Sequence, residues 1–577
     1  MTTQTHSKFQ GLIAATLIGA IFVLSVVTAN DYGVSWDEPI DLYVAERSLR
    51  YALTLNPAWI DPSVPVSFAV EGKHAYLLPG LPPWRLLFFG NFLSSIGCYL
   101  FFEKLGLMSS TEAHHFPNKL LFVSLLIVVF VFVRRNFNIY TALAVVPAIA
   151  FQPRFWADMQ FNLKDFPYAC FVAFTLICAR NAVLKYSWKG AILSAALLGL
   201  AAATKPNAAL IAVILAVWFI FGRSQMAEVG SRAKKLFWVT VALSPLIAFS
   251  VYVLVWPYLW TDPIDHFLNF LNYYSGLSTQ GPGYFQFDKI LLFLSVQPPA
   301  VLLFAAIGIM LSVREIAIGT RRELNVLLLL WLFLPVLRVT LPGVYDYDGV
   351  RHFIEYSVPL GILTGWGFVS FCSRFHKIFS NHVPQKAAIG LVAIIASLLP
   401  AGWAYTMCKI HPYEIAYFNF LVGGTKGAQQ RWSTATDYWG SSYRDGMKWL
   451  NQHTEHGALL SVPVGTHIVY STKDMWLRDD IIFLRSYRER FNPESLEILN
   501  RFYKNPQEPL YVMYITRRDW YTNMVRLLES REKPVYQITV EGAPILKIYK
   551  INSMDETMAK TMGLINPNES NNEKISP

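Results

Sequence analysis

Long apolar runs separated by short polar loops dominate the first 405 residues of the chain. A bilayer core is crossed by about 20 consecutive apolar residues in a helix. On this criterion the pattern predicts about eleven transmembrane helices, near residues 11–29, 117–133, 139–156, 166–184, 190–204, 206–222, 236–256, 290–312, 325–341, 353–372 and 387–405. Lys205-Pro206 divides the 190–222 stretch into two of these spans. The predicted fold is therefore a polytopic α-helical membrane protein.

The distribution of basic residues predicts its orientation. The loops at 134–138, 180–189, 223–235, 313–323 and 373–386 hold fifteen lysines and arginines, and the alternate short loops hold about five. Cytoplasmic loops carry the excess of positive charge. The first set of loops and the N-terminus are therefore predicted to be cytoplasmic, and the C-terminal region to be extracytoplasmic, in a bacterial inner membrane.

Three polar regions interrupt or follow the spans. A long extracytoplasmic loop covers residues 30–116, and its segment Trp84 to Met108 is predicted to be an interfacial helix. Residues 406–552 are predicted to form an α/β domain, with strands at 458–464, 510–515, 535–540 and 545–551 and a helix at 442–453. Residues 553–577 are polar and are predicted to be disordered. The transmembrane domain is thus predicted to occupy residues 1–405.

Composition supports the membrane assignment. Of the 577 residues, 54% are hydrophobic and 15% charged, whereas soluble proteins carry about 25% charged residues. The net charge of +10 lies mostly in short loops between spans, which favours topology over nucleic-acid binding. The five cysteines form no metal-binding or disulfide framework, although Cys98 and Cys408 are predicted on the same side and could pair. Nucleotide-binding glycine motifs are missing from the sequence.

The candidate functional residues fall on the predicted extracytoplasmic side. Acidic residues at a membrane edge are costly to keep and usually mark function. Asp37 and Glu38 follow the first span, in Ser35-Trp36-Asp37-Glu38-Pro39. The others lie at the ends of later spans: Arg154, Asp158, Lys164, Asp165, Lys205, Arg338, Asp346, Asp348, Arg351 and His352. Each of these residues also has a structural interpretation, as a helix cap, a polar turn or an interfacial anchor; their joint placement on one side favours function.

The combination of acids and cations suits transfer of a sugar from a lipid phosphate. A carboxylate can deprotonate the acceptor hydroxyl, and cations can hold the departing phosphate. Asp37, Glu38 and Asp165 could also converge on a divalent cation. Lys205 and Arg351 can neutralise phosphate directly, so the sequence favours a site without metal or other cofactor.

The motifs resemble the GT-C class of membrane glycosyltransferases, in particular the lipid-carrier-dependent branch of protein O-mannosyltransferases and lipid A aminoarabinose transferases. Ser35-Trp36-Asp37-Glu38 resembles the first-loop Asp-Glu motif of that class. The segment from Pro153 to Pro167 resembles its second-loop Asn-Pro-Lys-Asp-x-Pro pattern, with Leu163 in place of the first proline. The segments Ala113 to Asn118, Gly199 to Pro206 and Tyr347 to His352 are also similar.

The resemblance implies an inverting glycosyltransferase with a polyprenyl-phosphate-linked sugar as donor and an extracytoplasmic lipid, glycan or protein acceptor. Asp37 is then expected to be the general base, with Glu38 as its partner. Lys164, Asp165, Lys205, Arg351 and His352 are expected to bind the donor and its phosphate. Two alternatives stay open: a transporter or lipid flippase, and a non-catalytic assembly scaffold.

Overall fold

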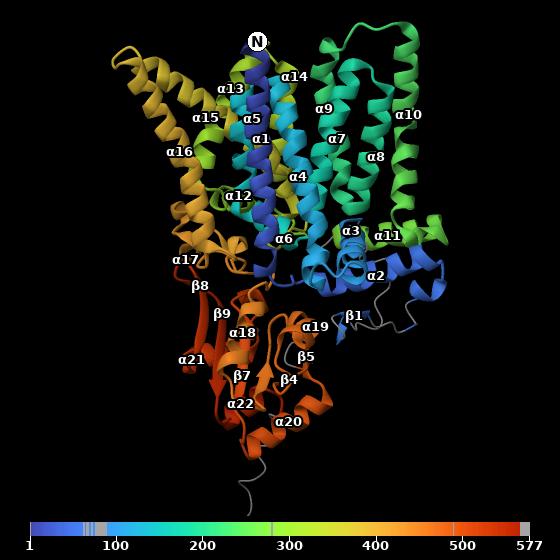
Figure 1. The fold of residues 1–577 in the computed structure, drawn as a ribbon. Coiled ribbons are helices and arrows are strands. Elements are labelled where there is room, and N and C mark those ends of the chain that lie inside the picture. The colour runs from blue at the N-terminus through green and yellow to red at the C-terminus, as the bar shows by residue number, and fades with distance from the viewer. Residues whose placement is uncertain are drawn as a thin grey trace, which may run out of the picture. The chain divides into compact units, whose positions relative to one another are not determined.

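The computed structural model describes residues 2–61, 64, 68–70, 73–75, 89–278, 281–487 and 490–565 (Figure 1). The chain divides into two compact units. The first contains residues 1–30, 44–65 and 79–414, and the second contains residues 31–43, 66–78 and 415–577. The short segment that carries Asp37 and Glu38 therefore belongs to the unit formed mainly by the C-terminal region.

The first unit is a bundle of helices (Figure 1). Its long helices are α1 (Thr2–Val27), α4 (Ser110–Asn136), α5 (Ile139–Ala150), α7 (Asp165–Lys185), α8 (Trp188–Thr204), α9 (Ala209–Gly222), α10 (Ser231–Leu254), α13 (Pro299–Ile318), α14 (Arg322–Arg338), α15 (Ser357–Phe379) and α16 (Gln385–Ile410). Shorter helices are α3 (Phe89–Gly97), α6 (Pro153–Phe161), α11 (Pro263–Ser278), α12 (Asp288–Ser295), the π-helix η4 (Cys98–Lys104) and the 3-10 helix η8 (Arg351–Tyr356). Helix α2 (Glu38–Thr54) crosses the boundary between the two units.

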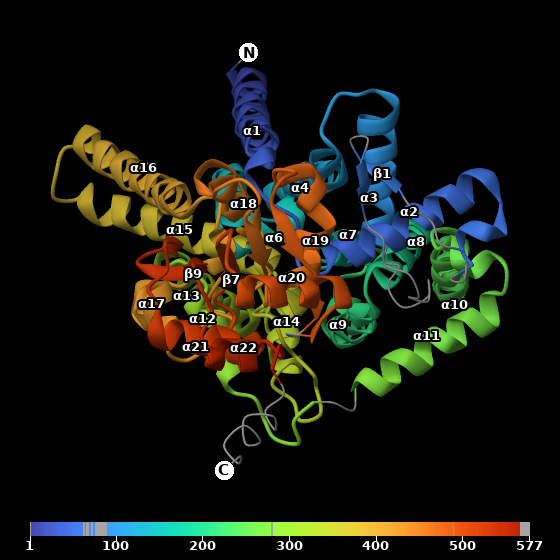
Figure 2. The same cartoon turned by 90° about the horizontal axis from the view of Figure 1, so that it is seen from below.

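Neighbouring helices pack pairwise through the bundle, with α7 against α4, α8 and α9, α8 against α10, and α14 against α9 and α13. Helix α15 packs against both α5 and α13. The views in Figures 1 and 2 show α11 running across the end of α10, roughly perpendicular to it. The bundle brings the ends of α7, α8 and α14 into one region.

Small residues allow α13 and α15 to approach each other closely. A Cβ atom on Gly308 of α13 would lie 2.2 Å from the carbonyl oxygen of Leu363, and one on Gly367 of α15 would lie 2.0 Å from that of Phe304. Helices in membranes associate by packing rather than by the hydrophobic effect, so close backbone contact at small residues is a main source of their stability.

Seven described helical segments are long and apolar enough to cross a membrane, and α5 and α8 are shorter apolar helices. The prediction of a polytopic helical membrane protein is confirmed. The predicted division of residues 190–222 is also correct, because α8 ends at Thr204 and α9 begins at Ala209. The segment predicted as an interfacial helix forms α3 and η4 from Phe89 to Lys104; residues 84–88 lie outside the described residues.

The second unit contains a five-stranded sheet in the order β4-β3-β7-β9-β8. The strands are β3 (Leu459–Ser461), β4 (Ile482–Leu484), β7 (Leu510–Ile515), β8 (Tyr536–Val540) and β9 (Ala543–Ile551). Strand β3 is parallel to β4 and β7, whereas β9 is antiparallel to β7 and β8. Two small antiparallel pairs add β1 (Phe68–Val70) with β2 (Lys73–Ala75), and β5 (Ser486–Tyr487) with β6 (Arg490–Phe491).

Helices α17 (Gly424–Ala428), α18 (Tyr443–His453), α19 (Thr466–Trp476), α20 (Pro493–Lys504), α21 (Asn523–Arg531) and α22 (Glu556–Thr561) complete this unit. Three of the four predicted strands and the predicted helix agree with β7, β8, β9 and α18 to within about two residues. The turn between β8 and β9 has positive φ angles at Glu541 and Gly542, as a tight hairpin requires. The predicted disorder from residue 553 is wrong for its first part, because α22 buries Met558 and Ala559.

Candidate functional site

A buried asparagine builds the turn between α6 and α7. The Asn162 side-chain oxygen accepts hydrogen bonds from the backbone N–H groups of Lys164 and Asp165, at 3.1 and 2.8 Å. Its amide nitrogen donates to the carboxylates of Asp158, at 2.6 Å, and Asp165, at 3.0 Å. Asn118 of α4 in turn donates to the Asn162 carbonyl oxygen at 3.0 Å. One side chain therefore caps the start of α7 and fixes two carboxylates.

Asp165 is the centre of a buried ion-pair network. One carboxylate oxygen pairs with the ammonium group of Lys205, and the other lies 3.2 Å from the Arg351 guanidinium. Arg351 also pairs with Asp348 at 3.1 Å and lies over the ring of Tyr347. All four charged groups are less than about a tenth exposed. The structure thus brings together Asp165, Lys205 and the Asp348–Arg351 pair, from three segments that are distant in sequence.

His352 and Arg338 extend this network. The Nδ1 atom of His352 lies 3.4 Å from the Lys205 ammonium, and its ring packs against Tyr347. The Arg338 guanidinium and the Asn207 amide both donate to the backbone carbonyl oxygen of His352, at 2.8 and 3.3 Å. Arg338, at the end of α14, therefore holds η8 in the position that presents Arg351 and His352.

Four more of the predicted residues lie in the first unit with other partners. Asp346 pairs with Lys289 of α12 at 2.6 Å. Arg154 and Asp158 are buried on α6, close enough to interact electrostatically. Lys164 is buried at the residue before α7. Of the twelve predicted residues, ten therefore lie in the first unit, whereas Asp37 and Glu38 lie in the second.

Burial controls the protonation of several of these groups. The pKa of Asp158 is raised to about 7, because burial and, to a smaller extent, the neighbouring carboxylate of Asp165 outweigh the lowering by the hydrogen bond from Asn162. Burial lowers the pKa of Lys205, while its pairing with Asp165 acts in the opposite direction. Burial, followed by the charges of Arg351 and Lys205, lowers the pKa of His352 well below its ordinary value. At neutral pH His352 is therefore a neutral hydrogen-bonding group rather than a cation.

Sequence reasoning missed Asn162, Lys289 and Glu355. Glu355 is buried in η8, and neither carboxylate oxygen has a hydrogen-bond partner among the described residues. The charges of Arg338 and Lys205 act on its carboxylate. Asn162 was part of the second-loop motif and could have been found there. Glu355 lies inside a predicted apolar span, which hid its relation to the cations.

The segment that carries Asp37 is anchored by aromatic and cationic side chains of the second unit. The ring of Trp36 lies 5.0 Å from Trp520 and 5.1 Å from His467, and the Arg517 guanidinium lies 4.7 Å above it. Glu38 is buried and accepts a hydrogen bond from the backbone N–H of Ser35 at 2.8 Å. Asp37 is half-buried, and its charge acts on His467. This arrangement fixes the backbone on both sides of the Asp37 carboxylate.

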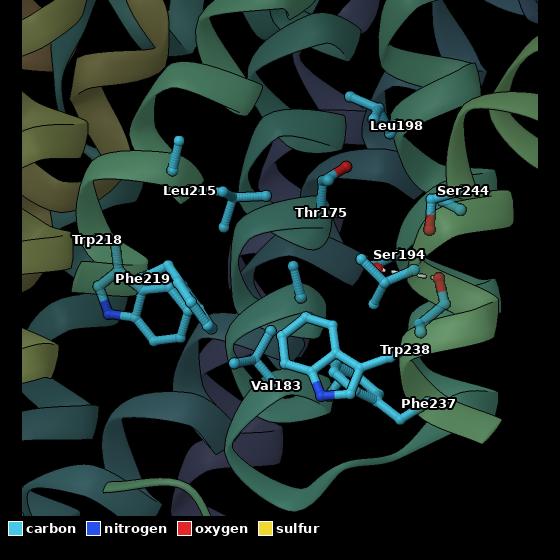
Figure 3. Close-up of a pocket in the computed structure, with 16 residues that line it drawn as sticks. Thr175, Val183, Ser194, Leu198, Leu215, Trp218, Phe219, Phe237, Trp238 and Ser244 are labelled. Atoms are coloured by element: carbon cyan, nitrogen blue, oxygen red, sulfur yellow. Dashed lines mark hydrogen bonds between the residues drawn. The ribbon is translucent and has the colours of Figure 1, made fainter. Parts of the chain in front are cut away.

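A separate cavity of about 300 Å³ lies among α7, α8, α9 and α10 (Figure 3). Its walls are almost entirely apolar and include Trp218, Phe219, Phe237 and Trp238. Its residue nearest to Asp165 along α7 is Thr175, which is about 15 Å away at the helical rise. The cavity is therefore distinct from the charged network and suits an apolar chain.

Part of the chain is similar in sequence to a known protein family. Residues 89–256 match the family model described as dolichyl-phosphate-mannose-protein mannosyltransferase. The matched segment includes Asp158, Asn162, Asp165 and Lys205. The resemblance inferred from the motifs is confirmed by this match. No protein of established function matches the chain in a sequence search of curated proteins.

Two solved structures are similar to most of the chain. ArnT from Cupriavidus metallidurans, bound to undecaprenyl phosphate, is 14% identical, with 93% of this chain and 98% of that chain covered and a TM-score of 0.48. The archaeal oligosaccharyltransferase AglB from Archaeoglobus fulgidus, in complex with an inhibitory peptide and a dolichol phosphate, is 12% identical, with 96% and 78% covered and a TM-score of 0.48.

Proposed function

We propose that the protein is a membrane glycosyltransferase that moves a sugar from a polyprenyl-phosphate donor to an acceptor outside the cytoplasm. The observation that carries this proposal is the network in which Asp165 is shared by Lys205 and Arg351. Asp165 lies at the start of α7, and both Asp165 and Lys205 lie within the segment that matches a mannosyltransferase family model.

In the proposed reaction the acceptor hydroxyl attacks the anomeric carbon of the donor sugar. The new bond joins the acceptor oxygen to that carbon, while the bond between the carbon and the phosphate oxygen breaks. Asp37 takes the acceptor proton, and Glu38 keeps the Asp37 segment in place through Ser35. A single displacement of this kind inverts the anomeric configuration.

The departing polyprenyl phosphate keeps the electron pair and needs positive charge close by. Lys205 and Arg351 supply that charge in the proposal, and Lys164 and neutral His352 add hydrogen-bond donors. Asp165 and Asp348 position the two cations through ion pairs. Since side chains supply the neutralising charge, the proposed mechanism uses no metal ion or organic cofactor. The acceptor is a lipid, a glycan or a protein hydroxyl.

The direct test is incubation of the purified full chain with a panel of polyprenyl-phosphate sugars, with detection of released polyprenyl phosphate and of the glycosylated product. We expect at least one donor to be consumed in the presence of an acceptor mixture. Translocation of the donor across liposomes with no glycosyl product would instead support a transporter or flippase. Failure to bind or consume any donor would support a scaffold.

The proposed orientation has its own test. In a cysteine-free chain, His456→Cys places a thiol on an exposed position of the second unit, and Ser380→Cys places one in the loop after α15. A membrane-impermeant maleimide applied to intact spheroplasts is expected to label the first variant and to leave the second unlabelled. The reverse pattern would contradict an extracytoplasmic site.

A further inference from the structure

A buried group of three side chains with different ligand atoms shares no member with the charged network of Asp165. Glu46 of α2, Cys98 at the start of η4 and His114 of α4 bring a carboxylate oxygen, a sulfur and an imidazole nitrogen within 4.8 Å of one another. All three side chains are less than a twentieth exposed. Sulfur, nitrogen and oxygen atoms of these residue types are the ligands found in protein zinc sites.

The hydrogen bond of His114 to Ser94 uses Nδ1, and Nε2 is the ring nitrogen on the side of Glu46. The Ser94 hydroxyl donates to the His114 carbonyl oxygen at 2.7 Å, so its oxygen is available to accept from the Nδ1–H group, 3.2 Å away. Nε2 then carries the lone pair, and it lies 4.0 Å from a carboxylate oxygen of Glu46. Metal-bound imidazole usually donates its other ring N–H to a hydrogen-bond acceptor, which fixes the histidine tautomer.

The distance between Nε2 of His114 and the Glu46 carboxylate oxygen excludes a direct hydrogen bond between them. A hydrogen bond between them would require about 2.7–3.2 Å, and the observed 4.0 Å is too long for one. At tetrahedral zinc, two bonds of about 2.0–2.2 Å separate their ligand atoms by roughly 3.4 Å, so binding would draw Nε2 and the carboxylate oxygen together by about 0.6 Å. The Cys98 sulfur lies within 4.8 Å of both atoms and would approach them by up to about 1.2 Å, given a zinc–sulfur bond of about 2.3 Å.

The Glu46 carboxylate has unsatisfied hydrogen-bonding oxygens in the part of the chain that the structure describes. Both of its carboxylate oxygens are buried without a hydrogen-bond partner among the described residues, and so is the hydroxyl of the nearby Ser95. The Arg50 guanidinium is 3.9 Å away and makes its short contact with Glu103 instead. A buried carboxylate left in this state is costly. A divalent ion bound by one thiolate, one carboxylate and one neutral imidazole would make the group electrically neutral.

We infer that Glu46, Cys98 and His114 form a binding site for Zn²⁺ or a similar borderline transition-metal ion, which ties α2, η4 and the start of α4 together. Binding releases the proton of the Cys98 thiol to solvent, together with that of Glu46, whose pKa burial raises to about 8, while His114 binds as the neutral ring. The residues come from three segments of the first unit, so the ion would stabilise the loop that follows the first span. This site is separate from the proposed sugar-transfer chemistry.

The test is the metal content of the purified, detergent-solubilised full chain after exposure to Zn²⁺ and removal of loosely bound ions with a weak chelator. About one zinc per chain is expected in the parent protein, and at most about a tenth of that in Cys98→Ser and His114→Gln. The matched controls, Cys408→Ser and His456→Gln, change exposed residues outside the group and are expected to keep the full content.

Cobalt provides a second measurement that does not depend on folding of the variants. The parent protein loaded with Co²⁺ is expected to show a thiolate-to-metal charge-transfer band in the near ultraviolet and visible bands of four-coordinate cobalt. If metal-free parent protein is incubated with Co²⁺ and these bands do not appear, the proposal is overturned. Equal zinc content in the parent protein and in both ligand variants would also overturn it.

Discussion

The backbone carbonyl oxygen of Trp36 accepts a hydrogen bond from Nε2 of His467 at 2.7 Å. Because a carbonyl can only accept, Nε2 carries the proton, and burial lowers the pKa of this histidine so that it is neutral at neutral pH. Trp36 directly precedes Asp37. The second unit thus positions the proposed base through its own side chains.

Replacing His467 should therefore impair catalysis rather than donor binding. We expect His467→Ala to lower kcat by about 10-fold to 100-fold, as small displacements of a catalytic group do, with little change in KM for the donor. His467→Gln can still donate to the carbonyl oxygen and should retain more activity. Steady-state kinetics measure both constants, and His456→Ala is the control at an exposed position. Unchanged kcat in His467→Ala would show that Trp36 needs no such support.

Lys205 is expected to bind the donor phosphate. A hydrogen bond to a charged group contributes about 1.5–3 kcal/mol, so Lys205→Met should raise KM for the donor by roughly 10-fold to 100-fold. Asp165→Asn should instead destabilise the protein, because it leaves Lys205 and Arg351 close together without their shared carboxylate. The double variant should regain stability without regaining donor affinity. Thermal unfolding and donor titration separate the two effects, and normal affinity in Lys205→Met would contradict the assignment.

Asp158 should make the stability of the protein depend on pH. Its pKa is raised from the ordinary 3.8 to about 7 in the folded state. The folded protein therefore holds a proton that the unfolded chain releases between these values. The resulting stabilisation is complete below the lower value and is lost as the pH rises to about 7, by up to about 1.4 kcal/mol per pH unit.

Asp158→Asn should remove this dependence, because its amide oxygen can still accept from Asn162 and does not ionise. Melting temperatures of the two proteins between about pH 5 and pH 7 provide the measurement. The parent protein should lose stability over this range relative to the variant. Parallel curves would show that Asp158 does not titrate there.

Arg180 of α7 and Glu323 of α14 form a buried pair with two hydrogen bonds, one of them at 2.9 Å. The Trp218 indole also donates to Glu323. Removing one member of a buried pair typically costs about 3–5 kcal/mol, so Arg180→Met should lower the melting temperature strongly. Arg180→Met with Glu323→Gln should restore part of the loss. Lys448→Met, which breaks a largely exposed pair with Asp445, should change stability by at most about 1 kcal/mol.

The sequence predicted those features that depend on local pattern. The long apolar runs predicted the helices of the bundle. Two short segments of alternating apolar and polar residues, joined by a Glu541-Gly542 turn, predicted β8 and β9. Asp165, Lys205 and Arg351 all lie at the ends of predicted spans, and the structure joins them by ion pairs, because helices that cross a bundle bring their ends to common levels. Strand β4 has three residues, of which only Leu484 is buried, and it gave no clear signal.

Contacts that depend on tertiary packing were not predictable. Glu46, Cys98 and His114 are 52 and 16 residues apart along the chain, and no spacing motif relates them. The assignment of residues 31–43 to the C-terminal unit rests on contacts such as Trp36 with Trp520 and His467. The sequence around Trp36 does not show that this side chain packs against Trp520 and His467, because its burial depends on the fold of a segment more than 400 residues away.

The central claim is that Asp37 removes a proton from the acceptor during transfer of a sugar from a polyprenyl phosphate. The most direct measurement compares the parent protein with Asp37→Asn in the donor-consumption assay, with Asp31→Asn as the control and donor binding measured in parallel. We predict that Asp37→Asn binds the donor normally and loses at least about 100-fold in turnover, while the control stays active. Full turnover by Asp37→Asn would contradict the account.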